Sequence, residues 1–592
     1  MELPSRPEGD RLLRSGEALD IRRRLRSLTQ QADLTAVIIN AFDRRTRMLP
    51  FHYSATRIAP AGARAIGSAL ADSGIVKTRI VLQQWNPNVK ASQVRIDGRI
   101  PDLLLVSSMQ IHMASARKLL RDACAIDPAH RPLILAGGPL VIYEPWHVFS
   151  AKADDPWATD VAITGEEYVL LNLLEVLLGQ RGRQESMRSA FLRLRDSGEL
   201  DDVPGLVYAR GKGPSSELAN TGTQRLLGDL DELPSATIGF GLLEAPSRQS
   251  TLASLPLEAS RVRRHSPIGS MVFTTGCKFS CPYCPIPAYN QRLQRFKSPG
   301  RIVEEMTQLN AQFGIRYVFG TDDNFFNDRV RATAILEGLA KARVNGRPLR
   351  RTLRWGTEVT VHDTLAMKDS LPLMRRAGGI ALWLGVEDIT ATFVKKGQSV
   401  DKVALAFSLL RAERIAPVPM LMHHDGQPLL TPGKPYGLLN QIRMLRQAGA
   451  VDVQVLTMTP ATGSRLYESA FDGQMIASAG AREVQPYMLD GNYAVASSHD
   501  PLWRMQLKTM VAWMYIYNPM QVLRAIVRPR SSRYLLDVGM QLVGQWGLLH
   551  TLPRMGAWML RLLTGANRKC EAPPSHLPLV SVERKTESVM AK

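Results

Sequence analysis

Three of the five cysteines in this chain lie within eight residues, at Cys277, Cys281 and Cys284. Their CxxxCxxC spacing puts three thiolates on one loop, where they can hold one face of an iron–sulfur cluster. Such a cluster keeps one iron without a protein ligand, and an open metal site can bind and activate a small molecule. A zinc site would usually need a fourth Cys or His at a related spacing, and only His265 lies nearby. Three unrelated core cysteines are the other alternative.

The cysteine loop follows the first of six apolar, strand-like runs that alternate with helix-like runs. Six such units within about 200 residues predict a partial or full parallel (β/α) barrel over residues 265–475. In such barrels the loops after the strands carry the chemistry, and the cysteines lie on one of them. We expect strands at 270–276, 316–322, 353–359, 380–388, 417–424 and 451–458, and helices at 300–313, 328–343, 367–377, 400–413 and 435–448.

Residues 33–180 show the same alternation of short apolar strands and helices. This pattern predicts an α/β domain with a doubly wound, Rossmann-like parallel sheet. Ligands of such sheets bind at the carboxyl ends of the strands. The expected strands are 35–42, 79–85, 103–109, 133–139 and 161–167, and the expected helices are 61–74, 110–125 and 168–178.

The rest of the chain divides by composition. We expect a basic N-terminal arm, a connector with a small hairpin between the two α/β domains, a helical and aromatic C-terminal domain, and a flexible tail. These parts span residues 1–32, 181–264, 476–565 and 566–592.

The chain carries 74 Lys and Arg against 54 Asp and Glu, a formal net charge of +20. This balance predicts an anionic partner, such as nucleic acid, an acidic membrane surface or a phosphate-bearing substrate. Between Trp503 and Lys569 there are ten bases and one acid, Asp537, interleaved with aromatic residues. The pattern favours peripheral membrane docking, or a lid over a hydrophobic or anionic substrate. A solvated basic face packed on the barrel is the alternative, and we do not expect nucleic acid because no recognised motif supports it.

Composition also indicates in which cellular compartment the protein works. Apolar residues make up 45% and charged residues 22%, which excludes a wholly disordered chain and a polytopic membrane protein. Few cysteines indicate a reducing compartment, and the polar, Arg-rich N-terminus is not a secretory signal. No stretch of about 18 apolar, uncharged residues is present. We therefore expect a cytoplasmic protein that touches a membrane, if at all, from one side.

The cysteine loop, with Tyr283 before its last cysteine, resembles the radical S-adenosylmethionine (SAM) superfamily over roughly residues 265–465. The resemblance implies a 4Fe–4S cluster on the three cysteines, with SAM chelating the open iron. A reducing partner such as flavodoxin or ferredoxin would then supply the electron that cleaves SAM to a 5′-deoxyadenosyl radical.

The same resemblance suggests residues that contact SAM. The run after the second strand looks like the "DDNF" form of the family, and Glu358 follows on the third strand. The segment from Gly385 to Asp388 resembles the family's "GxE" motif, and residues 393–397 also look similar. A helix N-cap is the alternative for the aspartates, and a salt bridge is the alternative for the second glutamate. The expected SAM-binding residues are Tyr283, Gly320, Thr321, Asp322, Asp323, Glu358, Gly385 and Glu387.

The sequence departs from the family after the sixth strand, where relatives more often carry an apolar-Gly-Pro turn. Here His423 and His424 stand in its place. An imidazole titrates near neutral pH, so the pair are candidate acid–base groups that face the substrate. Equally, they are candidates for polar residues whose hydrogen bonds are satisfied at a strand end.

The arrangement of a parallel-sheet domain ahead of the barrel resembles cobalamin-binding radical SAM enzymes. Small residues at strand ends let the backbone approach a bulky nucleotide tail. A DxHxxG motif is absent, so we expect no histidine from such a motif on cobalt; a degenerate domain that binds nothing is the alternative. The expected cobalamin-binding residues are Ser107, Ser108, Gly137, Gly138, Thr164, Gly165 and Glu166, with a matching connector segment at 229–234.

The function that this resemblance implies is cobalamin-dependent radical C-methylation of an unactivated carbon in a hydrophobic or natural-product substrate. One alternative keeps the cofactors but makes the enzyme an oxidative cyclase, or one that forms or rearranges carbon–carbon bonds without methyl transfer. Another is a non-catalytic cobalamin-binding or membrane-associated accessory protein. Neither Cys124 nor Cys570 has an evident role.

Overall fold

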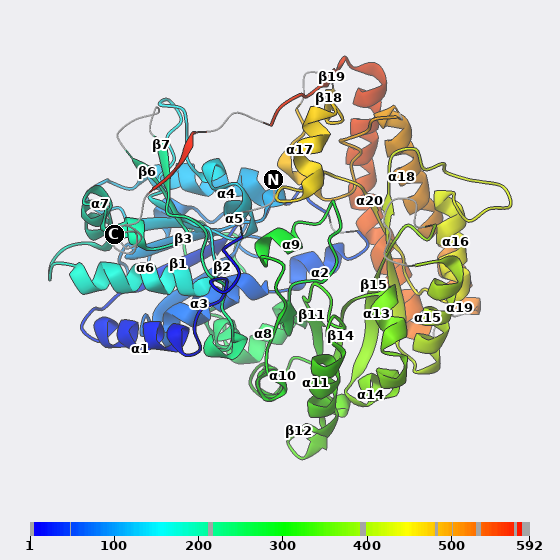
Figure 1. Ribbon diagram of the computed structural model, residues 1–592, viewed down its shortest axis with the longest axis horizontal. Helices are drawn as coiled ribbons and strands as arrows, with labels where there is room; N and C mark the ends of the chain where they lie inside the picture. Colours follow the sequence, from blue (N-terminus) through cyan, green and yellow to red (C-terminus); the bar gives the residue numbers. More distant parts are fainter. Residues whose placement is uncertain are drawn as a thin grey trace. The chain divides into compact units, whose positions relative to one another are not determined.

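The computed structural model describes residues 5–47, 49–210, 217–390, 398–479, 483–499, 501–528, 534–573 and 577–582. These residues form two compact units, drawn in Figure 1. We call them the sheet unit and the barrel unit. Within the described residues, the sheet unit comprises 5–44, 59–265 and 577–582, and the barrel unit comprises 45–58 and 266–573.

The core of the sheet unit is an eight-stranded sheet in the order β2-β1-β3-β4-β5-β6-β7-β20. Its first five strands are parallel. The order 2-1-3-4-5 is that of a flavodoxin-like doubly wound sheet, so the predicted fold is confirmed. These strands are buried along nearly their whole length because helices cover a parallel sheet on both faces. They are β1 (Thr35–Asn40), β2 (Lys77–Leu82), β3 (Leu103–Ser107), β4 (Leu133–Gly137) and β5 (Val161–Ile163), with helices α3 (Ala61–Asp72), α4 (Met113–Asp122), α5 (Pro139–Tyr143) and α6 (Glu167–Gln180).

The outer strands of this sheet come from segments that we expected to lie outside the domain. The hairpin of β6 (Leu206–Arg210) and β7 (Glu217–Asn220) pairs antiparallel with β5, and β20 (Leu579–Ser581) adds parallel to β7. The structure thus differs from the expected connector and flexible tail. The physical reason is the open edge of β5, whose backbone groups need partners. The expected N-terminal arm likewise contains a helix, α1 (Glu17–Thr29), which packs on α6.

The core of the barrel unit is an open sheet of six parallel strands in the order β17-β16-β15-β14-β11-β8. All six predicted strands are confirmed, and the sheet is a half-barrel rather than a closed ring. The strands are β8 (Ile268–Met271), β11 (Tyr317–Gly320), β14 (Arg354–Thr360), β15 (Gly379–Glu387), β16 (Ala416–His423) and β17 (Gln454–Thr457). The helices between them are α10 (Pro299–Phe313), α11 (Arg329–Lys341), α14 (Leu371–Arg376), α15 (Val400–Ala412) and α16 (Leu438–Ala448).

Two further segments complete the barrel unit. The C-terminal helices α18 (Leu502–Ile516), α19 (Pro519–Val527) and α20 (Tyr534–Thr564) pack on α16, β17 and one another. Residues 45–58, from the N-terminal part of the sequence, pack on the same unit, where α2 (His52–Arg57) contacts α20. Among the described helices, none is long and apolar enough to span a bilayer.

Gly138 lies in the turn after β4, and replacing it tests whether this turn requires glycine. Its φ of 92° and ψ of 179° are essentially restricted to glycine, and an added Cβ would lie 2.8 Å from the Ser108 carbonyl oxygen. Gly98 has a φ of 77° but open space around it. We expect Gly138→Ala to destabilise the sheet unit by about 2 kcal/mol more than Gly98→Ala, because overpacking adds to backbone strain. Thermal unfolding compares the variants, and equal losses would contradict this account.

Candidate active site

The cysteine loop begins at the carboxyl end of the first half-barrel strand. It runs from β9 (Thr274–Thr275) to α9 (Ile286–Tyr289), and β9 pairs with β10 (Arg295–Phe296). Gly276 opens the loop with a φ of +85°, and an added Cβ would lie 2.0 Å from the Leu293 carbonyl oxygen. Only glycine fits here, because both the backbone conformation and the close approach exclude a side chain.

The residues that follow β11 hold the entry to this loop. The Asp322 carboxylate accepts hydrogen bonds from the backbone N–H groups of Phe273 and Thr274, at 2.8 Å each. The Asp323 carboxylate accepts one from the Gly276 N–H at 2.6 Å. Charge-assisted bonds of this kind are stronger than neutral ones. The two aspartates therefore fix the direction in which the loop leaves β8.

Asn327 holds the next turn of the loop. Its side-chain amide donates to the Gly276 carbonyl at 3.0 Å, and its oxygen accepts from the Lys278 N–H at 3.2 Å. We call Asp322 to Asn327 the anchor segment. Asp363, at the start of α13 (Val361–Ala366), accepts from both Lys278 Nζ and Asn324 Nδ2 and so ties loop and anchor segment together.

Asn324 was part of the predicted DDNF run, but the sequence interpretation missed Asn327 and Asp363. Both are buried polar residues in the structure. The signal for Asn327 was present, because it lies only four residues after Asp323 in the run DDNFFN. Asp363 lies 36 or more residues away in sequence, and its role depends on tertiary contact. The anchoring shows that Asp322 is a structural residue of the loop, and its predicted contact with SAM stays a prediction.

The three cysteines of the loop are half-buried, and none of the chain's five cysteines is in a disulfide. Burial, together with the negative charges of Cys281, Asp323 and Cys277, raises the pKa of Cys284 to about 12. The thiols are therefore close enough to interact. No three His, Cys, Asp or Glu side chains in the described part of the chain are placed to hold a single metal ion. A cluster fits this arrangement better than zinc, because each cysteine of a cluster binds a different iron atom.

Carboxylates from three neighbouring strands converge beside the cysteines. Burial, together with the nearby charges of Asp323, Asp322 and Glu387, raises the pKa of Glu358 to about 8. Burial also raises the pKa of Asp322 to about 6, against the hydrogen bonds that it accepts. The pKa of Tyr283 is raised by burial and then by Glu387 and Cys281. The structure thus brings together five of the predicted SAM-binding residues.

Glu387 stands in an unusual backbone conformation at the end of β15. Its φ is +56°, and the pairing of β15 with β16 shifts register between Gly385 and Glu387. The Gln398 amide donates to the carbonyls of Val386 and Asp388, on either side. A left-handed non-glycine residue costs about 1–2 kcal/mol, and such strain is typically found at functional sites.

The remaining SAM-binding predictions have other surroundings. Gly320 has no room for a side chain, because a Cβ would lie 2.6 Å from the Asp322 carboxylate. Thr321 is exposed, and its hydroxyl donates to the Met271 carbonyl at 3.1 Å. Residues 393–397, which also resembled the family, lie outside the described residues.

His423 and His424 are both buried and bonded within the protein. His423 Nδ1 lies 2.8 Å from the Gln427 side-chain oxygen. His424 Nδ1 lies 2.9 Å from the Asp425 carbonyl, and its Nε2 lies 3.8 Å from the Asp388 carboxylate. This arrangement gives each Nδ1 a partner, and both the structural and the acid–base interpretation stay predictions.

The inner face of the half-barrel becomes apolar away from the carboxylates. Glu358 pairs in register with Trp383, whose ring lies 4.8 Å from that of Phe319. On β16 and β17 the same face carries Met420, Met422 and Leu456, which are half-buried. Half-buried apolar side chains beside a polar cluster are typical of small-molecule sites.

The predicted cobalamin-binding residues lie along one edge of the sheet unit, at the ends of β3, β4 and β5. A Cβ added to Gly137 would meet only the Ile163 carbonyl oxygen, at 4.0 Å, so this edge leaves space for a ligand. Ser107 and Thr164 beside it are half-buried. These residues fit a bulky ligand that approaches the backbone closely.

The other predicted cobalamin-binding residues serve the fold. Ser108 is buried, and its hydroxyl donates to the Met109 carbonyl. Gly165 is closed off by Gln224, and the buried Glu166 carboxylate accepts from the Leu227 N–H at 2.7 Å. Their contact with cobalamin, like that of Gly138, stays a prediction.

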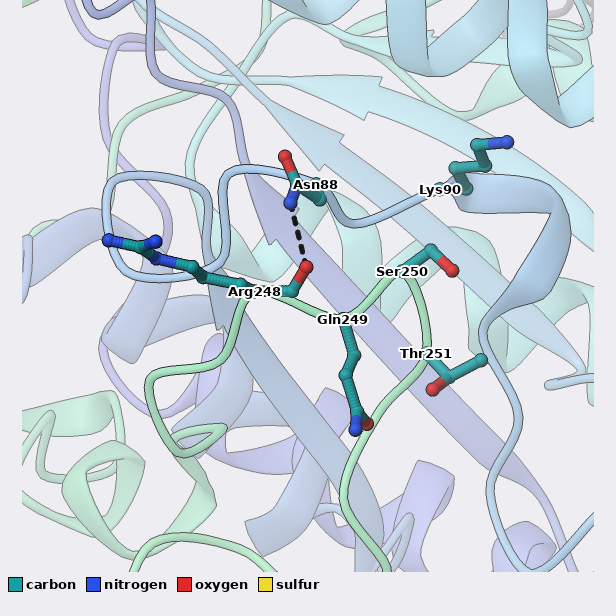
Figure 2. A pocket seen from close by; sticks show the side chains of 6 residues that line it. All are labelled: Asn88, Lys90, Arg248, Gln249, Ser250 and Thr251. Atoms are coloured by element: carbon teal, nitrogen blue, oxygen red, sulfur yellow. Dashed lines mark hydrogen bonds between the residues drawn. The ribbon is translucent and has the colours of Figure 1, made fainter.

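A separate pocket lies in the sheet unit, beyond β2. Figure 2 shows its lining, in which the Asn88 amide donates to the Arg248 carbonyl at 2.7 Å. It is open and polar and contains none of the predicted site residues. Its lining comes from the loop after β2 and from residues within the expected connector: Asn88, Lys90, Arg248, Gln249, Ser250 and Thr251.

Replacing Asn327 by alanine tests the anchoring. The change leaves the Gly276 carbonyl and the Lys278 N–H without their partner, at a cost of about 1–3 kcal/mol. We expect the Asn327→Ala protein to bind much less iron and sulfide after anaerobic reconstitution. The matched control is Asp328→Ala, which removes the N-cap of α11 and an exposed ion pair with Arg331 but no contact to the cysteine loop. Normal iron loading in Asn327→Ala would contradict the anchoring.

The raised pKa of Glu358 predicts that the stability of the folded protein depends on pH. Its pKa rises from an ordinary 4.5 to about 8 on folding, so its stabilising contribution is complete below about pH 4.5 and is lost as the pH rises to about 8. We therefore expect Glu358→Gln to be neutral near pH 5 and to stabilise the cluster-free protein by a few kcal/mol near pH 8. Melting temperatures across this range measure it. An effect independent of pH would contradict the raised pKa.

Comparison with known proteins agrees with this geometry. Residues 271–427 match the model of the Radical SAM superfamily. The chain is 30% identical over 132 residues to the hopanoid C-2 methylase of Rhodopseudomonas palustris (strain TIE-1), covering 22% of this chain and 24% of that protein. It is 25% identical over 260 residues to the anaerobic magnesium-protoporphyrin IX monomethyl ester cyclase of Rubrivivax gelatinosus, covering 43% and 40%. The chain thus spans less than half the length of these curated relatives.

The fold is similar to that of a solved radical S-adenosylmethionine methyltransferase, TsrM from Kitasatospora setae, whose structure contains cobalamin and a [4Fe–4S] cluster. The TM-score is 0.57, and the match covers 87% of this chain and 99% of that chain. At 13% identity this similarity shows the fold alone.

Proposed function

We propose that this chain, whose residues 271–427 form a radical SAM domain, is a cobalamin-dependent radical SAM enzyme that methylates an unactivated carbon of a hydrophobic substrate. The observation that carries the proposal is the cysteine loop held by the anchor segment beside converging carboxylates. When bound, the cluster and SAM supply a radical that abstracts hydrogen, and cobalamin supplies the methyl group.

Different residues of the barrel unit have different roles in the proposed reaction. Cys277, Cys281 and Cys284 hold the cluster. Glu358 and Glu387 bind the ammonium or ribose end of SAM, because a cation or donor there stabilises the charged form of Glu358, whose pKa is raised. Tyr283 lies between the last cysteines and Glu387 and orients the same ligand.

The sheet unit holds the second cofactor in the proposal. Ser107, Gly137 and Thr164 line the edge of the sheet along which the nucleotide tail of cobalamin lies. The hydroxyls donate hydrogen bonds to that tail, and the missing side chain of Gly137 leaves it room. No histidine from a DxHxxG motif reaches cobalt.

The substrate is hydrophobic in the proposal. Two observations support this: the half-buried Met420, Met422 and Leu456 on the inner face, and the similarity to a hopanoid methylase. Apolar side chains at this place bind the carbon skeleton and exclude water from the reacting carbon. A flavodoxin or ferredoxin in the cytoplasm supplies the electron.

A second function keeps the cofactors and omits methyl transfer. The similarity to an anaerobic cyclase favours it. In that case the same loop and carboxylates act, and the substrate radical does not take a methyl group.

Isotope tracing distinguishes the methylating enzyme from the enzyme that omits methyl transfer. The full chain, reconstituted anaerobically with iron, sulfide and cobalamin, is incubated with methyl-labelled SAM, a reductant and a hopanoid lipid extract. We expect 5′-deoxyadenosine, S-adenosylhomocysteine and a labelled lipid together. The Cys281→Ala protein should form none of them, because the cluster loses a ligand.

The other outcomes are equally informative. Deoxyadenosine with an unlabelled, cyclised product would favour the second function. Wild-type protein that loads iron and cobalamin but forms no deoxyadenosine with any reductant would contradict both and favour an accessory protein.

A further inference from the structure

Helix α19 presents its apolar side to solvent. The residues buried in the structure are Gln521 and Ala525, one turn apart. The exposed residues include Leu523 and Val527, with 53% and 67% of their surface accessible. In an ordinary surface helix the apolar stripe faces the core and the polar side faces water. The pattern of α19 is the reverse.

Helix α20 shows a similar pattern in its first half, where the buried side carries the polar residues Asp537 and Gln541. Further along, Thr551 is buried together with the apolar residues Leu548, Met555, Trp558 and Leu562. The exposed side of α20 carries large apolar residues that recur at intervals of three, four, seven or eleven and therefore lie on one face of the helix. They are Leu535, Leu542, Trp546, Leu549, Leu560 and Leu563.

The two helices are in contact with each other. Figure 1 shows them in orange to red, beside α18. We call their exposed apolar residues together the C-terminal apolar face. Single exposed apolar residues are normal, but a large contiguous group marks an interaction site.

The charge of this region is strongly positive. Arg524 and Arg528 are exposed on α19. The only acidic residue between positions 503 and 569 is Asp537, which is buried. Helices α2 and α16, which pack against α20 and α18, contain no acidic residue either. The partner of this face must accept apolar side chains and carry negative charge.

Two occupants suit a long apolar stripe: a second copy of the chain and a lipid surface. A second copy would bring the same arginines against these arginines, without acidic residues to pair with them. An anionic bilayer offers acyl chains to the leucines and phosphate groups to the arginines. No described helix is suited to span a membrane, so the contact lies in the plane of the surface.

We propose that α19 and α20 dock the protein on the surface of an anionic membrane, with their apolar residues in the boundary between headgroups and acyl chains. Trp546, which is 44% exposed in the middle of the α20 stripe, lies at the depth that tryptophan prefers. The proposal goes beyond the proposed function and holds whether the reaction is methylation or not.

Vesicle flotation of the reconstituted full chain tests the docking. We expect it to float with vesicles of phosphatidylcholine and phosphatidylglycerol, and to bind vesicles of phosphatidylcholine alone about tenfold more weakly. The double variants Leu523→Ser/Val527→Ser and Arg524→Glu/Arg528→Glu should each reduce binding to the mixed vesicles about tenfold. All four residues are exposed, so circular dichroism and iron content should not change.

A matched control comes from the same unit. Val330 on α11 and Leu405 on α15 are 79% and 52% exposed, apolar, and outside the C-terminal apolar face. The Val330→Ser/Leu405→Ser protein should bind mixed vesicles like the wild type. Brominated lipid should quench tryptophan fluorescence in the wild type and less in Trp546→Phe, which places this face on the lipid.

Other outcomes overturn the proposal. Equal binding to both kinds of vesicle, or loss of binding in the control as well, would show that the face is not a specific lipid site. A dimer in sedimentation that Leu523→Ser/Val527→Ser dissociates, without vesicle binding, would show that the face joins two copies of the chain. None of these measurements depends on catalytic activity, so they separate this proposal from the proposed function.

Discussion

Asp322, Asp323 and Asn327 hold the backbone of the cysteine loop through its first turn, from Phe273 to Lys278. A loop with three cysteines has no regular structure of its own, and fixing it costs backbone entropy at every residue. The anchor segment offsets this cost with charge-assisted bonds from a neighbouring strand end. It thereby brings the cysteines beside the carboxylates of β14 and β15, and the rest of the site depends on that placement.

The carboxylates themselves are destabilising in the protein without ligands. The pKa of Glu358 lies near 8, because the group is buried and three further carboxylates lie nearby, and Glu387 is held in a strained conformation. A protein retains such an arrangement where a ligand relieves it. A ligand that carries an ammonium and a sulfonium group would supply the positive charge that the site lacks.

Much of the fold could be predicted from the sequence because parallel strands buried on both faces read as short apolar runs. Both sheets and the position of the cysteine loop were predicted on this basis. A small hairpin was expected in the connector, but its pairing with β5 was not, because edge pairing links residues distant in sequence. For the same reason the packing of residues 45–58 on the barrel unit, and the role of Asp363, could not be predicted. The conformation of Glu387 depends on Gln398, whose amide bonds cannot be predicted from sequence spacing.

In the proposed enzyme, the cysteine loop holds a cluster whose open iron binds SAM. The electron paramagnetic resonance spectrum of the reduced, reconstituted chain, recorded with and without SAM, tests this binding. We expect the signal of a reduced 4Fe–4S cluster that shifts when SAM is added. A cluster signal that SAM leaves unchanged, in protein with full iron loading, would contradict it.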